Sequence, residues 1–143
     1  MGDLTFTMIK PDAVRAHKEA DILKHLTDAG FRIVALRMHC MSREQAERLY
    51  AVHRDKPFFG TLVEFMTSGP VVAAVLKKEN AVAELRRRVG ATDPAEAAEG
   101  TVRRLYGTDK TMNAIHASDS DDNARKEWAI HFADGEIMTQ SAG

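Results

Sequence analysis

The residues best suited to chemistry lie in the stretch NAIHASDS, which runs from Asn113 to Ser120. Small or apolar residues flank His116, so the backbone around this histidine is predicted to be buried. The serine and aspartate residues that follow are typical of a helix start. A helix N-terminus favours anions such as phosphate, because it presents free N–H groups and a partial positive charge. A neutral imidazole at such a position can attack phosphorus, which makes His116 a candidate nucleophile. The alternative interpretation is that His116 is a hydrogen-bonded histidine of the core.

Basic side chains are the second group suited to phosphate chemistry, because the chain contains neither G-x-x-x-x-G-K-[ST] nor G-x-G-x-x-G. Any bound phosphate must therefore be held by Lys and Arg side chains. The candidates are Lys10, expected at the end of a strand, and the arginines at 86–88 and 103–104. The more ordinary interpretation of the triplet at 86–88 is a solvated last turn of a helix. No spacing of Cys and His residues indicates a zinc site.

Composition narrows the classes of protein. The chain has 143 residues, the size of one domain, and we expect a single domain over 1–143. Its net charge of -1 argues against a general binder of nucleic acids or anionic membranes. The one cysteine, Cys40, excludes an intramolecular disulfide and fits a cytoplasmic location. The sequence shows no signal peptide and no apolar run of membrane-spanning length, so we expect no membrane association.

Hydrophobic periodicity predicts the elements that position these residues. Strands are expected at 4–9, 33–40, 71–76 and in the NAIHASDS segment. Five helices are expected. The first ends at Gly30, the second begins with the Ser42–Gln45 capping box, and the third runs from Pro57 to Met66. The fourth runs from an Asn80 cap to Gly90, and the last begins at Ser118 or Ser120. Residues 91–111 show no period and read as a long loop, and the tail from Ala133 reads as weakly ordered.

The order of these elements predicts the fold class. Strands alternate with helices and form two βαβ-like halves. The best-fitting architecture is an α/β (α+β) sandwich of the ferredoxin-like, split βαβ type, in which helices cover a four-stranded antiparallel sheet.

Six segments together give a more specific result: the whole chain resembles the nucleoside diphosphate kinase family. They occur in the family's order and spacing, from Thr5 to about Phe132. The segments are IKPDAV at 9–14, KPFF at 56–59, FMTSGPVV at 65–72, GATDPA at 90–95, EGTVR at 99–103 and NAIHASDS. The resemblance implies the ferredoxin-like fold and a two-step exchange, in which a nucleoside triphosphate phosphorylates a histidine and a nucleoside diphosphate then accepts the phosphoryl group.

The resemblance also assigns roles, residue by residue. His116 matches the nucleophile, Ser118 and Glu127 match residues that orient its imidazole, and Tyr50 matches a tyrosine near it. The residues matching phosphate-binding groups are Lys10, Arg86, Thr92 and Arg103. Phe58 matches the aromatic residue on which the base stacks, and Asn113 together with Lys10 matches the groups that hold the sugar. The implied partners are ATP and other nucleotides, with Mg²⁺ bridging their phosphates and no protein metal ligand. A homo-oligomer built from dimers into a tetramer or hexamer is implied as well.

Some positions depart from the family's usual pattern. Ala117 and Ala13 stand where glycine is common, Lys77-Lys78 replaces an acidic-glycine pair, and the segment 104–111 has no match. Two other classes of function remain as alternatives. One is a catalytically silent nucleotide-binding module of the same fold, and the other is an interaction protein that docks through the arginine triplet. A side activity that phosphorylates proteins would use the same histidine.

Overall fold

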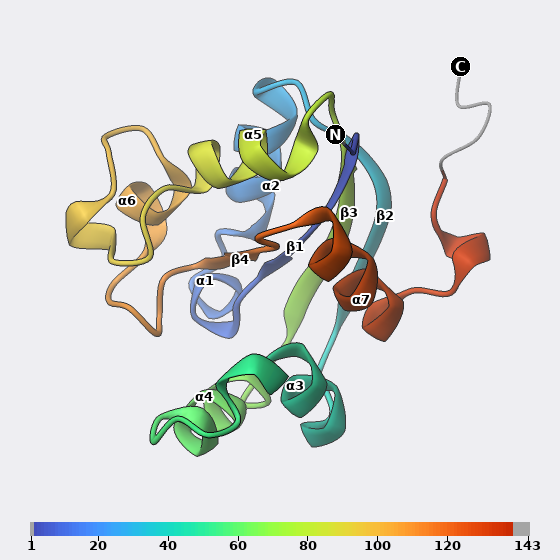
Figure 1. Cartoon of the computed structure of the whole chain (residues 1–143). Helices are drawn as coiled ribbons and strands as arrows, with labels where there is room; N and C mark the ends of the chain where they lie inside the picture. Colours follow the sequence, from blue (N-terminus) through green and yellow to red (C-terminus); the bar gives the residue numbers. More distant parts are fainter. Residues whose placement is uncertain (1, 139–143) are drawn as a thin grey trace.

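The computed structural model describes residues 2–138 and contains a four-stranded sheet with helices on both faces (Figure 1). The strand order is β2-β3-β1-β4, and each neighbouring pair is antiparallel. This arrangement confirms the predicted ferredoxin-like sheet. The strands are β1 (Leu4–Ile9), β2 (Arg32–His39), β3 (Val71–Lys77) and β4 (Ile115–Ala117).

The helices alternate with these strands along the chain. The α-helices are α1 (Pro11–Arg15), α2 (Glu19–Asp28), α3 (Arg43–Leu49), α4 (Phe59–Met66), α5 (Ala81–Val89), α6 (Val102–Tyr106) and α7 (Asp121–His131). Short 3-10 turns cover Ala51–His53, Pro94–Glu96 and Asp134–Glu136. Over residues 2–138, no helix combines the length and apolar character needed to cross a bilayer.

The sheet separates two hydrophobic cores, because successive strand residues point to opposite faces. On β1, Ile9 packs toward one core, whereas Phe6 and Met8 pack toward the other. The first core also contains residues of α1, α2, α5 and α6, and the second contains residues of α3, α4 and the end of α7. Figure 1 shows α7 crossing one side of the sheet and α3 and α4 below it.

The predicted helix signals are mostly confirmed. Ser42 and Gln45 form the reciprocal capping box of α3, and the Ser120 hydroxyl caps α7 by accepting from the Asn123 amide at 3.1 Å. Gly90 ends α5 with φ +92°, a conformation that favours glycine. Asn80 occupies the predicted N-cap position of α5, but its side chain makes no capping hydrogen bond and its backbone is left-handed, φ 57°, which asparagine tolerates.

The boundaries differ from prediction in several places. Helix α1 directly follows Lys10 and was not predicted, because five residues are too few to establish a helical period. Helix α4 begins at Phe59 rather than Pro57. The expected loop at 91–111 contains α6, and the tail expected to be weakly ordered forms the turn at 134–136. The last part of the tail that is expected to be weakly ordered, residues 139–143, lies outside the described residues.

Strand β2 is an edge strand with an irregular register. Its pairing with β3 shifts between Ile33 and Ala35, so Val34 and Ala35 are both buried. Beyond this bulge, Leu36 and Met38 are exposed. A bulge changes the face to which later residues point, which is why a simple alternation across this strand does not describe its burial.

Candidate active site

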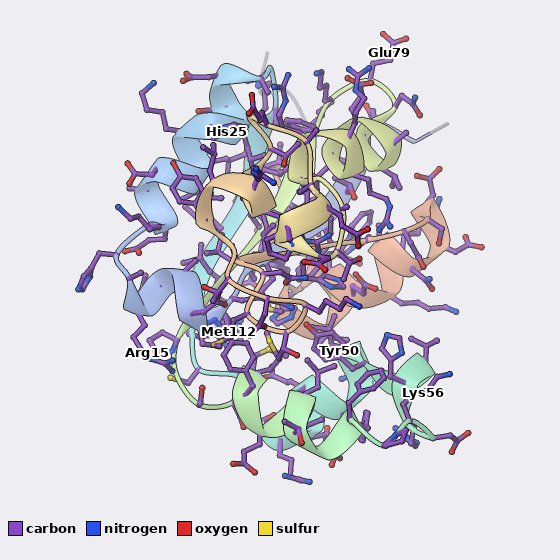
Figure 2. All side chains as sticks on the ribbon, turned by 90° about the vertical axis from the view of Figure 1, so that its left-hand side faces the viewer. Arg15, His25, Tyr50, Lys56, Glu79 and Met112 are labelled. Carbon is purple, nitrogen blue, oxygen red and sulfur yellow. The ribbon has the colours of Figure 1, made fainter. Side chains whose placement is uncertain are left out.

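A cleft of about 610 Å³ opens between the segment that contains α3 and α4 and the edge formed by β4, α5 and the segment 91–113. Figure 2 views this side of the molecule, with Tyr50 labelled on the α3 side and Met112 on the loop side. Ser118 lies behind the cleft and is fully buried. The other predicted site residues line it: Lys10, Tyr50, Phe58, Arg86, Thr92, Arg103, Asn113, His116 and Glu127.

His116 occupies the middle of β4 and is paired with Met8 of β1. Its neighbours Ile115 and Ala117 belong to the core on the opposite side of the sheet, so strand alternation turns the His116 ring toward α3 and α7. The Thr7 hydroxyl donates to the His116 carbonyl at 2.7 Å. The backbone of His116 is therefore held by its pairing with β1 and by the Thr7 hydroxyl, and the direction of its ring follows from the strand geometry.

One ring nitrogen of His116 has a fixed partner. Nε2 lies 2.7 Å from Glu127 Oε1, and the same oxygen accepts from the Ser118 hydroxyl at 2.6 Å. A carboxylate only accepts hydrogen bonds, so the proton of a neutral His116 imidazole resides on Nε2. Nδ1 then carries the lone pair. This arrangement is the one that a nucleophilic imidazole requires.

Tyr50 lies directly beside the nucleophile candidate. Its ring meets the His116 ring edge-on, with the centroids 5.8 Å apart. Its hydroxyl is buried and has no hydrogen-bond partner within residues 2–138. Burial, with the nearby Glu127 charge as a smaller cause, holds the pKa of Tyr50 well above its ordinary value. Tyr50 therefore keeps its proton and can donate to a group bound next to His116.

Lys10 is the most enclosed cation of the cleft. Its Nζ donates to Asn113 Oδ1 at 2.8 Å and to the Thr111 carbonyl at 3.1 Å. Burial lowers the pKa of Lys10 to about 8, and the positive charge of Arg103 adds to this effect. A bound anion would restore the preference for the charged form.

Two arginines extend the positive charge across the cleft. Arg103 donates to the carbonyls of Gly90, at 3.1 Å, and Ile115, at 2.8 Å, and Arg86 donates to the Ala117 carbonyl at 3.3 Å. Burial and Arg86 lower the pKa of Arg103 to about 10. Within residues 2–138, no carboxylate forms an ion pair with either guanidinium. Their charges are thus positioned by backbone carbonyls and remain available for an anion.

The remaining basic residues of interest have structural partners. Arg87 points to Glu84 of its own helix at 3.2 Å, so only Arg86 of the triplet reaches the cleft. Lys78 donates to the Ala29 carbonyl at 2.9 Å, pairs with Glu84 and lies 5.0 Å from the centre of the Phe31 ring. This departure from the family pattern therefore connects α2, β3 and α5 and adds nothing to the cleft.

The other departures are also explained by the backbone. Neither Ala13 nor Ala117 has a positive φ; Ala13 lies in α1 and Ala117 pairs with Thr7 in the sheet. In the segment that carries His116, the residue with a positive φ is Ala114, at 75°. The Ile115 amide donates to the Asn113 carbonyl at 2.9 Å, which closes a three-residue turn around Ala114.

The outer end of the cleft is made differently. The side chain of Phe58 is about half exposed (49%), and Val52 is 82% exposed. Asn113 Nδ2 donates to the carbonyls of Thr92, at 3.0 Å, and Lys110, at 3.1 Å, which holds the loop segment against the cleft. Sequence reasoning assigned no site role to several lining residues. Asp119 belongs to NAIHASDS, where its type indicates only a helix start, and the others belong to no recognised motif: Leu49, Val52, His53, Thr61, Leu62, Lys110, Thr111 and Asn123.

No protein metal cage is evident in the part of the chain that the structure describes, since no three His, Cys, Asp or Glu side chains gather there. Most charged side chains of the cleft are cations, and its two carboxylates are the exposed Asp119 and Glu127, which is hydrogen-bonded to His116 and Ser118. These residues fit a divalent ion that arrives on phosphate groups better than one held by the protein.

Comparison with known proteins agrees with this geometry. The sequence profile of the family described as "Nucleoside diphosphate kinase" matches residues 3–137. The nucleoside diphosphate kinase of Chlorobaculum parvum is 52% identical over 134 residues, covering 94% of this chain and 96% of that protein. That of Phenylobacterium zucineum is 51% identical over 138 residues, covering 96% and 99%.

Solved structures lead to the same family. The Aquifex aeolicus nucleoside diphosphate kinase superimposes with a TM-score of 0.92 at 46% identity, covering 94% of this chain and 98% of that one. The Halobacterium salinarum enzyme, solved in complex with CDP, has a TM-score of 0.90 at 42% identity, covering 95% and 91%. The chain whose cleft centres on His116 belongs to the nucleoside diphosphate kinase family.

Proposed function

We propose that this enzyme moves the γ-phosphoryl group of a nucleoside triphosphate to a nucleoside diphosphate through a phosphohistidine on His116. The observation that carries the proposal is the pairing of His116 Nε2 with Glu127 at 2.7 Å, beside Lys10, Arg86 and Arg103, none of which forms an ion pair with a carboxylate of residues 2–138. The imidazole keeps a lone pair on Nδ1, and the cleft is prepared for negative charge. Such an arrangement favours attack on phosphorus.

In the first half-reaction, Nδ1 of His116 forms a bond to the γ-phosphorus. The bond between that phosphorus and the bridging oxygen breaks, and its electron pair leaves with the diphosphate. The imidazole becomes positively charged as it bonds to phosphorus, and Glu127 stabilises that charge through Nε2–H. Tyr50 and the cations Lys10, Arg86 and Arg103 would offset the charge on the oxygens in motion.

In the second half-reaction, a terminal oxygen of another nucleoside diphosphate attacks the phosphorus, and the bond to Nδ1 breaks. The electron pair returns to the imidazole, so His116 is restored without a net proton transfer. One nucleotide pocket can serve both half-reactions, because donor and acceptor have the same layout of base, sugar and two inner phosphates, whichever base each carries.

The nucleotide would lie along the cleft with its phosphates inward. Phe58 would stack on the base, Lys10 and Asn113 would hydrogen-bond the sugar, and Thr92 would contact a phosphate. The relative from Halobacterium salinarum was solved with CDP, which supports a nucleotide as the ligand here. Mg²⁺ would arrive with the nucleotide rather than on protein ligands, and it would neutralise part of the phosphate charge beside Lys10, Arg86 and Arg103.

Two further properties complete the proposal. The enzyme assembles as a homo-oligomer built from dimers, a tetramer or a hexamer, which sedimentation analysis measures directly. The chain forms one domain over residues 1–143. The enzyme acts in the cytoplasm, and its single cysteine is compatible with that reducing compartment.

The decisive experiment is incubation with γ-labelled ATP, followed by acid and alkali treatment of the labelled protein. We expect label that is lost in acid and kept in alkali, as for a phosphohistidine. Adding an unlabelled nucleoside diphosphate should move the label to the corresponding triphosphate. His116→Ala should abolish labelling and exchange while nucleotide binding remains, because this side chain performs the chemistry. A wild-type protein that binds nucleotides without becoming labelled would instead be a silent binding module.

A further inference from the structure

The strained turn at Ala114 lies next to two residues proposed to contact the nucleotide or its phosphoryl group. Ala114 is fully buried and has φ 75°, a backbone region that residues with a Cβ rarely adopt. It separates Asn113 from β4, which carries His116. Such a conformation persists only where surrounding contacts enforce it, so those contacts help to set the position of the site.

The enforcing contacts come from one short segment of the chain, Lys10-Pro11-Asp12. The Lys10 amide donates to the Ala114 carbonyl at 2.8 Å. The Ala114 amide donates to Asp12 Oδ2 at 3.1 Å. Both polar backbone groups of Ala114 are therefore held by the segment in which β1 ends and α1 begins.

Asp12 does not line the cleft, yet it is costly to keep where it is. Its second oxygen, Oδ1, is buried and has no hydrogen-bond partner within residues 2–138. Burial raises the pKa of Asp12, and the amides of Ala114, Asp12 and Ala13 together with Lys10 oppose that rise. A buried polar atom without a partner destabilises a fold, so Oδ1 adds no stability of its own, and the clear long-range contact of this carboxylate is the one between Oδ2 and Ala114.

We propose that Asp12 is a positioning residue of the phosphotransfer reaction, because its carboxylate holds the Ala114 turn that places Asn113 and His116. The inference rests on the function proposed above, since it concerns the rate of phosphoryl transfer at that site. A displacement of about 1 Å can cost about 10²-fold in rate when reacting groups must be aligned. Loss of the hydrogen bond between Asp12 and Ala114 is therefore expected to slow phosphoryl transfer.

Asp12 has a second, electrostatic consequence. Lys10 has a pKa of about 8 because burial and Arg103 lower it, whereas the negative charges of Asp12 and Asp109 raise it. Neutralising Asp12 removes one of the two charges that favour the protonated form. The pKa of Lys10 then falls further, so Lys10 loses its proton at a lower pH. This shift follows from the charge of Asp12, whereas the rate of phosphorylation depends on its contact with Ala114, so the two effects can be measured separately.

Two substitutions separate these effects. Asp12→Asn keeps an oxygen that can accept from Ala114 but removes the charge, whereas Asp12→Ser is too short to reach the turn. We expect Asp12→Ser to slow single-turnover phosphorylation by about tenfold to a hundredfold, the range for residues that orient a reactive histidine. We expect Asp12→Asn to transfer almost normally near neutral pH, with the alkaline limb of its kcat/KM profile moved to lower pH.

Asp121→Asn is the matched control. Asp121 also accepts from a backbone amide, that of Gly2 at 3.0 Å, but it lies outside the cleft. Its single-turnover rate and pH profile should equal those of the wild type. Both measurements follow the phosphoenzyme formed from γ-labelled ATP, and circular dichroism checks that each variant is folded.

The outcomes are distinguishable. Absence of labelling in the wild type would remove the proposed function itself. With an active wild type, the positioning role of Asp12 is overturned by a wild-type rate in Asp12→Ser. If Asp12→Ser does not fold, Asp12→Glu decides, because it keeps the charge but lengthens the side chain that holds Ala114: a reduced single-turnover rate supports the role, and a wild-type rate overturns it.

Discussion

The two ends of the cleft are built in different ways. At the inner end, Lys10, Arg103 and His116 are buried or partly buried, and each is held by at least two hydrogen bonds or sheet contacts. At the outer end, Phe58 and Val52 expose 49% and 82% of their surface. The inner end is a preorganised polar site, and the outer end is an open apolar surface.

This difference separates two tasks of a nucleotide exchanger. Groups that stabilise a charge in motion are effective only when they are already in place, so rigidity at the inner end favours transfer. Recognition of the base needs only a surface on which any aromatic ring can stack. We therefore expect strict demands on the sugar and phosphates together with tolerance of the base.

The strongest test of this contrast removes the 3′-hydroxyl of the substrate. If Lys10 and Asn113 hold the sugar hydroxyls, a 3′-deoxy nucleotide leaves buried polar groups without partners. Sites built in this way can reject such analogues by about 10⁴-fold. The measurement is kcat/KM for ATP and 3′-deoxy-ATP, with GTP, CTP and UTP as controls for the base. A 3′-deoxy analogue as good as its parent, together with a strong preference for one base, would reverse the contrast.

A smaller effect is expected from Glu127→Gln at the inner end. The amide oxygen can still accept from His116 and Ser118, but the negative charge that stabilises a positive imidazole is lost. Single-turnover phosphorylation should fall by about tenfold to a hundredfold, as for carboxylates that orient metal-bound histidines. Nucleotide affinity should change little. The exposed Glu44→Gln on α3 is the control, and equal rates in all three proteins would make Glu127 structural only.

The sequence predicts the inner end better than the outer end, for a physical reason. Phosphate chemistry requires particular side-chain types, so motifs that contain Lys10, Arg103 and His116 identify it. The capping box at Ser42, the alternation in β1 and the continuous apolar run of β3 are likewise local signals, and the structure confirms them. They were sufficient to predict the antiparallel sheet.

The features missed by prediction depend on the backbone or on tertiary contacts. Lys10 donates to the backbone carbonyl of Thr111, and every residue type has such a carbonyl, so the identity of residue 111 does not predict this contact. The turn at Ala114 and the bulge in β2 are also backbone features. Asp12 belongs to a recognised motif, IKPDAV, yet only its distance to the Ala114 amide reveals what it does.

At the outer end, Phe58→Ala tests whether the base is held by stacking alone. Stacking on an aromatic side chain contributes about 1 to 3 kcal/mol, and the low end applies to a ring that is half exposed. We expect KM to rise by about tenfold, similarly for adenine, guanine, cytosine and uracil nucleotides, with the single-turnover rate at saturation nearly unchanged. Val52→Ala removes apolar surface from the same wall without an aromatic face, so its effect should be smaller. A loss confined to one base would show that the outer end has specificity after all.

The smallest expected effect concerns strain stored at the inner end. Ala114 and Ala124 are equally buried, at 0% and 1% exposure, but only Ala114 has a positive φ. Glycine in the interior of α7 should cost about 1 kcal/mol for backbone entropy, and removal of a buried methyl adds to that loss. At Ala114, glycine instead relieves a conformation that costs an L-residue about 1 to 2 kcal/mol. Urea unfolding should therefore show Ala114→Gly to be more stable than Ala124→Gly by at least about 1 kcal/mol. Equal losses in the two variants would mean that the Ala114 turn stores no strain, and that Asp12 and Lys10 hold a backbone already at rest.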